Sequence, residues 1–437
     1  MEEKGGAGYG LRKSRFFYGW YIVAVGFLAN VASAFSLAST LSVFLKPLTQ
    51  EMGVSRGVYS LLRSGETLLH AGLAPVIGSL VDRYGPRWLM AIGALVAGTG
   101  YLLLSQVHEF WQFALVRWSV VTLGDSFMGY MVVNVTISRW FIRQRGRAIA
   151  FSAMGIGFAK AGMPVIAAAL LVWLGWRLTW ATFGIITFAL VIGPAFFFMR
   201  RRPEDLGLHP DGAPGSFPET IGAEKNKRPA SAIRAAPEVA WSRREAVRTP
   251  AFWFIVLTFG VSSIGVTGLN LHVFPYVIDI GHSPIVAATV MSVIALMQMS
   301  SPLVWGFVSE RVGLPKVTML KFLIQAVGLS LAITAGDLAF LYLGFFLYGI
   351  GLGGTMVLQD VLWANYFGRL SLGAVRGLGL LLTNFLAACG PPFFGFLFDM
   401  TRSYYVSFAL FACALLASAL LSLCLRPPKK RSTKTIL

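Results

Sequence analysis

The sequence predicts an all-α membrane protein in which twelve transmembrane helices form two pseudo-symmetric bundles of six. Of its 437 residues, 56% are hydrophobic and only 13% are charged, whereas soluble domains carry about 25% charged residues. The mean hydropathy is +0.68. A loop pattern that begins at Gly78 recurs at Gly306, 228 positions later. The composition and the repeat together indicate a duplicated bundle of membrane helices.

Each half contains six apolar stretches close to the roughly 20 residues that cross a hydrocarbon core. In the first half we expect them at 19–45, 57–80, 87–106, 112–136, 148–172 and 178–199. In the second half we expect them at 252–277, 285–309, 317–335, 339–361, 376–398 and 404–425. The predicted domains are an N-terminal bundle (1–200), a cytoplasmic linker (201–250) and a C-terminal bundle with a short cytoplasmic tail (251–437).

The net charge of +18 is explained by membrane topology, so we expect no nucleic-acid partner. Most basic residues lie in the loops on one side, whereas the loops on the other side hold only Lys46, Arg56, Arg177 and Arg402. The positive-inside rule therefore predicts that both termini are cytoplasmic.

The repeated loop follows the second and the eighth predicted helices. Asp82 ends the second helix, where it can face the N-terminal dipole of a neighbouring helix. Such a contact suits a conformational latch that breaks when the halves rock, which we favour over the alternative that the charges only keep the turn out of lipid. The predicted latch residues are Gly78, Asp82, Arg83, Gly85, Arg87, Gly306, Glu310, Arg311 and Gly313.

The same loop resembles the signature between helices two and three of the major facilitator superfamily. Further stretches resemble a bacterial branch, the relatives of monocarboxylate porters and oxalate:formate antiporters. They are Tyr18-Gly-Trp20-Tyr, Trp140-Phe141 with Arg145-Gly146, Arg202-Pro203-Glu204-Asp205, and Asn365-Tyr-Phe-Gly-Arg369 with Arg376-Gly377. The resemblance implies a secondary transporter of a bacterial inner membrane. It would move a small, monocarboxylate-like organic anion by alternating access, in symport with protons.

The chain departs from that branch where the carboxylate is expected to bind. Members typically use an Arg on helix eight, and the oxalate type adds a Lys on helix eleven. Here helix eight offers Gln298 and helix eleven offers Asn384. Either first-half cations replace the missing ones, or the substrate is not a small carboxylate.

Ionisable residues inside the predicted helices are costly, so they are the main site candidates. Asp125 and Lys160 lie at matching depths in helices four and five and are expected to form a central pair. Protonation of Asp125 would free Lys160 to hold a carboxylate. The alternative is a purely structural ion pair.

Arg63, Glu66 and His70 are spaced three and four residues apart, on one face of helix two. Glu66 and His70 could carry a proton, or the three could form a satisfied structural network. Arg117 lies about one and a half turns below the outer surface, where we expect it to snorkel and to control access. Lys321, just inside helix nine, is expected to snorkel as well.

Neutral polar residues give further possible substrate contacts, although each could equally bond a neighbouring helix. His272 precedes Pro275 and is also expected in an outer gate. These possible contacts are Asn30, Asn270, His272, Gln298 and Asn384.

Several function classes are excluded or disfavoured. Gly349, Gly351 and Gly354 match a dinucleotide pattern but fall mid-helix, where glycine serves close packing. There is no phosphate-binding loop of the ATPase type, and no set spaced for metal or nucleophile chemistry, so we expect no enzyme, cofactor or metal. Efflux of amphipathic organics and a non-transporting sensor remain alternatives. The sequence indicates no oligomeric state.

Overall fold

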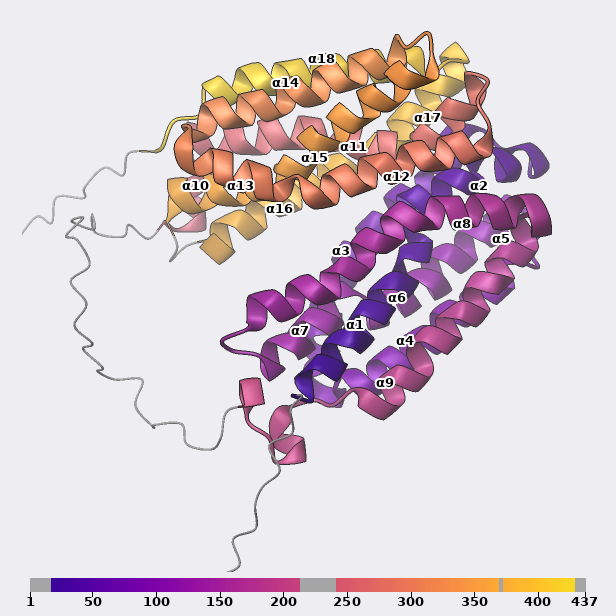
Figure 1. Ribbon diagram of the computed structural model, residues 1–437, viewed down its shortest axis with the longest axis vertical. Coiled ribbons are helices and arrows are strands. Elements are labelled where there is room, and N and C mark those ends of the chain that lie inside the picture. The colour runs from indigo at the N-terminus through magenta and orange to yellow at the C-terminus, as the bar shows by residue number, and fades with distance from the viewer. Residues whose placement is uncertain (1–16, 213–240, 369–371, 429–437) are drawn as a thin grey trace, which may run out of the picture.

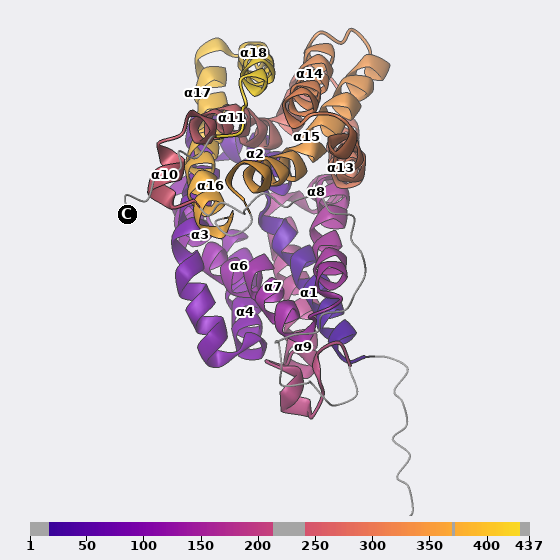
Figure 2. The same ribbon diagram turned by 90° about the vertical axis from the view of Figure 1, so that its left-hand side faces the viewer.

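The computed structural model describes residues 17–212, 241–368 and 372–428. Within these ranges all regular elements are helices, and they form two bundles, the N half and the C half. Figure 1 shows the two bundles touching near α2, α8, α12 and α17 and diverging toward α7 and α10. Figure 2 shows α9 at the far end of the N half from α17 and α18.

The N half consists of α1 (Gly19–Ser33), η1 (Ala34–Ser36), α2 (Ala38–Glu51), α3 (Arg56–Tyr84), α4 (Pro86–Leu104), α5 (Phe110–Val116), the π-helical turn η2 (Arg117–Val121), α6 (Thr122–Met128), α7 (Tyr130–Trp140), α8 (Arg145–Thr187), the π-helical turn η3 (Phe188–Ile192) and α9 (Gly193–Phe198). Two expected transmembrane helices are broken. The first is interrupted by extended backbone at Leu37 and the fourth at Gly129.

The long helix α8 contains the fifth expected transmembrane helix and the first part of the sixth, which continues through η3 and α9. At Gly175 the backbone has φ 71° and ψ 170°, a conformation that only glycine adopts easily. The Tyr18 hydroxyl donates to the Phe198 carbonyl at 2.9 Å, and the Trp176 indole donates to Glu51 at 2.5 Å. The segment after Gly175 therefore runs antiparallel to α1 and α2, which shows that the chain reverses there.

The linker region contributes short elements, and its residues 213–240 lie outside the described ranges. The described elements are η4 (Pro203–Leu206), η5 (Pro210–Gly212) and α10 (Arg243–Val247). The predicted domain boundaries at 200 and 250 stay predictions.

The C half begins at Pro250, and side-chain caps with proline in the first turn start two of its helices. Thr249 caps the first helix and Ser283 the second. A 41° bend at Ser301 separates α12 from α13. The elements are α11 (Pro250–Asp279), α12 (Pro284–Ser300), α13 (Pro302–Arg311), α14 (Leu314–Ile333), α15 (Leu338–Phe367), α16 (Leu372–Ala388), α17 (Gly390–Thr401) and α18 (Tyr405–Leu423).

Among the described residues, nine helices are long and apolar enough to cross a membrane, or ten if the bent pair α12 and α13 is one span. All twelve predicted helices have a counterpart. Two of them share the continuous stretch Arg145–Phe198, and α3, which is not among the nine, corresponds to the second. The predicted fold class is confirmed.

The two ends of the molecule differ. We call the end with Tyr18, Gly85, Phe141 and Arg200 the basic end, and the end with Glu51, Arg56 and Gly175 the outer end. Ion pairs and hydrogen bonds join the halves at the outer end and also between the middle of α8 and the last turn of α12. The halves diverge toward the basic end in Figure 1.

Candidate transport site

The charged residues of α3 form a buried network with helix four. Glu66 accepts from Arg63 Nη1 at 3.2 Å and from Arg117 Nε at 2.5 Å. The Arg117 side chain is fully buried, while that of Arg63 is 24% exposed. One carboxylate therefore serves two cations, so these three residues together carry a net positive charge.

The predicted snorkelling of Arg117 is wrong. Its guanidinium lies 5.3 Å from the Trp180 ring, and its Nη1 and Nη2 are buried without a hydrogen-bond partner in the described part of the chain. Arg117 opens the π-helical turn, and the extra residue in that turn rotates the preceding side chains relative to those that follow. A regular α-helix with 3.6 residues per turn would therefore give the Arg117 side chain the wrong direction around the helix axis.

Asp125 is buried on α6 beside α4. A Cβ at Gly124 would collide with the backbone of Ala97, so glycine permits the close approach of these helices. The Tyr101 hydroxyl lies 3.3 and 3.4 Å from the two Asp125 oxygens and 2.7 Å from Ser36 Oγ. Tyr101 and Ser36 were not among the predicted site residues, because only tertiary packing brings them to Asp125.

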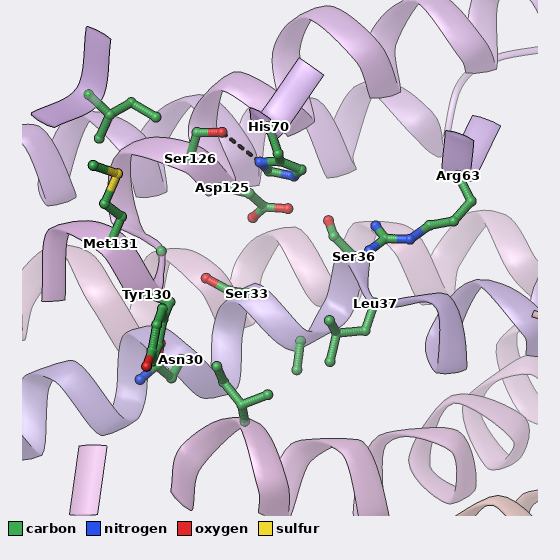
Figure 3. A pocket seen from close by; sticks show the side chains of 14 residues that line it. Asn30, Ser33, Ser36, Leu37, Arg63, His70, Asp125, Ser126, Tyr130 and Met131 are labelled. Atoms are coloured by element: carbon green, nitrogen blue, oxygen red, sulfur yellow. Dashed lines mark hydrogen bonds between the residues drawn. The ribbon is translucent and has the colours of Figure 1, made fainter. Parts of the chain in front are cut away.

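A cavity of about 320 Å³ lies in front of these groups. His70 Nδ1 is 2.8 Å from Ser126 Oγ at its wall. Figure 3 shows the Asp125 carboxylate, the Ser36 hydroxyl and the Arg63 guanidinium around a common space. The polar residues lining the cavity are Asn30, Ser33, Ser36, Arg63, His70, Asp125, Ser126 and Tyr130.

The cavity lies at the two helix breaks of the N half. Leu37 and Gly129, which line it, are the N-cap positions of α2 and α7, and neither helix has a side-chain cap. The N-terminus of a helix carries a partial positive charge and free N–H groups. Two such ends together with Arg63 make the cavity attractive to an anion.

Lys160 lies at the seam between the halves, one turn along α8 from Ile156, which lines this cavity. Its Nζ donates to Gln298 Oε1 of the C half at 2.8 Å. A small cavity of about 20 Å³ brings both residues together with Ser39 and Asn270. The sequence predicted Lys160, Asn270 and Gln298 as site residues, and the structure brings them together.

The predicted pair of Asp125 and Lys160 is not formed. Asp125 faces Tyr101 inside the N half, whereas Lys160 faces Gln298 across the seam. Residues at the same depth in two helices lie at the same level in the membrane, but they need not face each other. The packing of each helix decides in which direction around its axis a side chain points.

The other predicted contacts have different surroundings. The Asn30 amide donates to the Ser152 carbonyl at 2.9 Å, which joins α1 to α8, and Asn30 also lines the larger cavity. Asn384 is exposed on α16 and lines neither cavity. Lys321 was expected to snorkel, but it is fully buried because α14 approaches α15 closely at Gly351 and Gly354.

The basic residues of the repeated loops contact their own halves. The guanidiniums of Arg83, Arg87 and Arg311 lie 5.3, 4.0 and 3.9 Å from the rings of Tyr84, Phe196 and Phe307. Gly85 has φ 79° and turns the chain between α3 and α4. Gly78 lies near Met131, while Gly306, Glu310 and Gly313 line a surface cavity. The Asp82 side chain lies outside the described part of the structure, so the latch stays a prediction.

The outer end is closed by a network that the sequence indicated only in part. Arg56 and Lys46 of the N half bind Asp279 of the C half at 2.6 and 2.8 Å. Asp399 accepts from the backbone N–H groups of Arg56 and Gly57 at 3.1 and 2.8 Å, at the N-terminus of α3. We call these residues, with His272 and Tyr404, the outer gate. Lys46 and Arg56 stood out as rare outer-end cations, but their partners were not predicted.

A family model matches nearly the whole chain. The Major Facilitator Superfamily model matches residues 26–302 and 273–436. The oxalate:formate antiporter of Oxalobacter formigenes is 27% identical over 78% of this chain and 75% of its own. The probable L-galactonate transporter of Escherichia coli K12 is 26% identical over 87% and 84%, and monocarboxylate transporter 4 of Rattus norvegicus is 24% identical over 93% and 82%.

Solved structures show the same fold. An inward-facing, unoccupied bacterial homologue of the human lysosomal transporter Spinster gives a TM-score of 0.69 at 16% identity, over 93% of this chain and 95% of that one. A D-xylose–proton symporter gives 0.67 at 15% identity, over 93% and 97%. The chain is thus an integral membrane protein that belongs to the major facilitator superfamily, a secondary transporter and not an enzyme.

Proposed function

We propose that the protein carries a small organic anion, of the monocarboxylate kind, together with protons across the membrane by alternating access. The excess of Lys and Arg at the basic end supports a cytoplasmic location for that end and for both termini. The membrane in this proposal is a bacterial inner membrane. Curated relatives named for oxalate, formate, galactonate and monocarboxylates support an organic anion as the substrate.

The observation that carries the proposal is the concentration of positive charge around the N-half cavity. Arg63 and two uncapped helix N-termini line it, and Lys160 lies one turn of α8 from its wall with a neutral amide as its partner. Ser39, the second residue of α2, lines the small cavity with Lys160, and its buried hydroxyl has no hydrogen-bond partner within the described ranges. An anionic group between Lys160 and the α2 N-terminus would meet donors from both.

Asp125 and His70 are the proton-carrying candidates. Both line the cavity, and neither has a cation as its hydrogen-bond partner. A bound anion repels a second negative charge nearby, so it favours the protonated form of Asp125. By linkage, the proton then favours anion binding equally, which gives symport without a direct ion pair of Asp125 with Lys160.

Alternating access needs a seam that can open at either end. In this structure the outer gate is closed and the halves diverge at the basic end. A substrate that replaces Gln298 as the partner of Lys160 would release one bond between the halves midway along the seam. Binding would thus be coupled to the rocking of the halves.

The test is uptake of labelled carboxylates into proteoliposomes with an imposed pH gradient. Lys160→Ala should lower uptake about 10- to 100-fold, because a charge-assisted hydrogen bond is lost. Asp125→Asn should make the remaining uptake independent of the gradient. Lys316→Ala, which removes an exposed cation at the basic end, is the control and should leave uptake unchanged. Full uptake by the Lys160 variant would overturn the anion site.

A further inference from the structure

His272 is fully buried at the seam, inside the outer gate. It lies on α11 and contacts both halves. Its Nε2 is 3.0 Å from Ser60 Oγ of α3 and 3.1 Å from the Pro391 carbonyl of α17. Its Nδ1 is 2.9 Å from the Tyr404 hydroxyl. All three neighbours are hydrogen-bonding groups, so the ring is fixed at both nitrogens.

The partners determine the protonation of the ring. The Pro391 carbonyl can only accept, so Nε2 carries a hydrogen. Ser60 donates its own hydrogen to the Arg56 carbonyl at 2.6 Å and therefore also accepts from Nε2. The Tyr404 oxygen accepts from Arg56 Nη1 at 2.8 Å, which leaves its hydroxyl hydrogen for Nδ1. Every hydrogen has an acceptor when His272 is neutral with the proton on Nε2.

A second proton on the ring breaks this arrangement. A hydrogen on Nδ1 would point at Tyr404, whose oxygen already accepts from Arg56 and whose own hydrogen would lose its acceptor. It would also place two cations on one hydroxyl in a buried site. The charged groups around the ring are Arg56 on α3, Asp399 on α17 and Asp279 at the end of α11. Asp279 is already bound by Arg56 and Lys46, and Asp399 by the N-terminus of α3.

Opening of the gate changes these surroundings. Ser60 and Arg56 belong to the N half and would leave with it, whereas Tyr404 and Pro391 stay with His272. Water then replaces the lost partners, and a hydrated histidine titrates near pH 6.5. We propose that His272 is a proton-binding site of the outer gate, and that the gate closes only over the neutral imidazole.

This inference does not depend on where the substrate binds. It assigns to the C half a proton site separate from Asp125 and His70, and it makes acid hold the outer end open. A proton taken up by His272 must be released before the carrier can turn to the basic end.

The experiment measures gate opening directly. Spin labels at Gln50→Cys and Ser403→Cys, exposed positions of the two halves at the outer end, report the distance across the gate by pulsed electron resonance. The full chain is used without substrate, after Cys389, Cys413 and Cys424 are replaced by Ser. From pH 7.5 to 5.0 the ratio of open to closed molecules should rise about 30-fold, as expected when one imidazole protonates only in the open form.

His272→Gln keeps a donor and an acceptor but binds no proton in this range, so its ratio should stay within about threefold. His108→Gln, an exposed histidine of the loop between α4 and α5, should follow the parent protein. A flat profile in the parent protein would overturn the proposal without any histidine variant. A shift in His272→Gln as large as in the parent would overturn it as well.

Discussion

The N half and the C half share a fold but treat buried charge in opposite ways. In the N half, Arg117 is fully buried and ion-paired with Glu66, and Asp125 is hydrogen-bonded to Tyr101. In the C half, Lys321 is equally buried, but its Nζ has no hydrogen-bond partner among the residues that the structure describes and lies 3.7 Å from the Phe322 ring centre. The N half thus organises charge around a cavity, while the C half supplies neutral groups at the seam and half of the outer gate.

The first and largest test of this difference removes the negative charge of Glu66 in the N half. Glu66→Gln would leave Arg117 buried without a counter-charge, and we expect a loss of about 3–5 kcal/mol in the free energy of unfolding. Unfolding of the purified protein in detergent measures this loss. Glu310→Gln, at an exposed residue of the second repeated loop, is the matched control and should change little. Equal stability of the two variants would show that the buried network is not structural.

In the C half we expect removal of a buried charge to raise the free energy of unfolding instead of lowering it. Lys321→Met removes a buried amine that lacks a counter-charge and keeps a similar shape, so the protein should become more stable by about 1–2 kcal/mol. Unfolding of the purified variant in detergent measures this gain in stability. A marked loss of stability would mean that Lys321 has an anionic partner, and the proposed difference between the halves would fail.

The smallest effect is expected outside the membrane, where Asp211 ties the linker to the loop between α7 and α8. Its carboxylate accepts from the backbone N–H groups of Ile142, Arg143 and Gln144 at 2.9, 2.7 and 3.2 Å. Burial alone would raise the pKa of Asp211, but these hydrogen bonds and the Arg143 charge outweigh it and hold the pKa below its usual value.

A lowered pKa in the folded state means that the carboxylate stabilises the docked loop at any pH above its unfolded value of about 3.9. The contribution is lost as the pH falls through the lower, folded value. Asp211→Asn should therefore raise hydrogen exchange at residues 142–144 at neutral pH, by less than about tenfold, because a neutral amide accepts more weakly. Unchanged exchange would show that the loop is held by other contacts.

The sequence was sufficient for the fold and for part of the site. Hydropathy and the repeat at Gly78 and Gly306 predicted all twelve helices, because these signals are local. The spacing of Arg63 and Glu66 placed them on one face of a helix for the same reason, and there they form an ion pair. The direction of Arg117 and the partner of Asp125 could not be predicted, because a π-helical turn and the close packing at Gly124 determine them.

The outer gate shows the same limit. Arg56 and Asp279 lie 223 positions apart and meet only through the docking of the two halves. Scarcity of cations at the outer end could mark Arg56 as unusual, but no local pattern identifies its partner. Contacts across the seam depend on the conformation of the carrier, which a hydropathy profile does not contain.

The central claim is that the substrate anion is held by cations of the N half. The most direct measurement compares initial uptake of the best-transported carboxylate by Lys160→Met and Lys321→Met in proteoliposomes. Both variants remove one lysine from the membrane interior and replace it with the same side chain. We predict that Lys160→Met loses at least about tenfold in uptake while Lys321→Met retains the parent rate. Retention by Lys160→Met with loss by Lys321→Met would contradict the account and place the anion site in the C half.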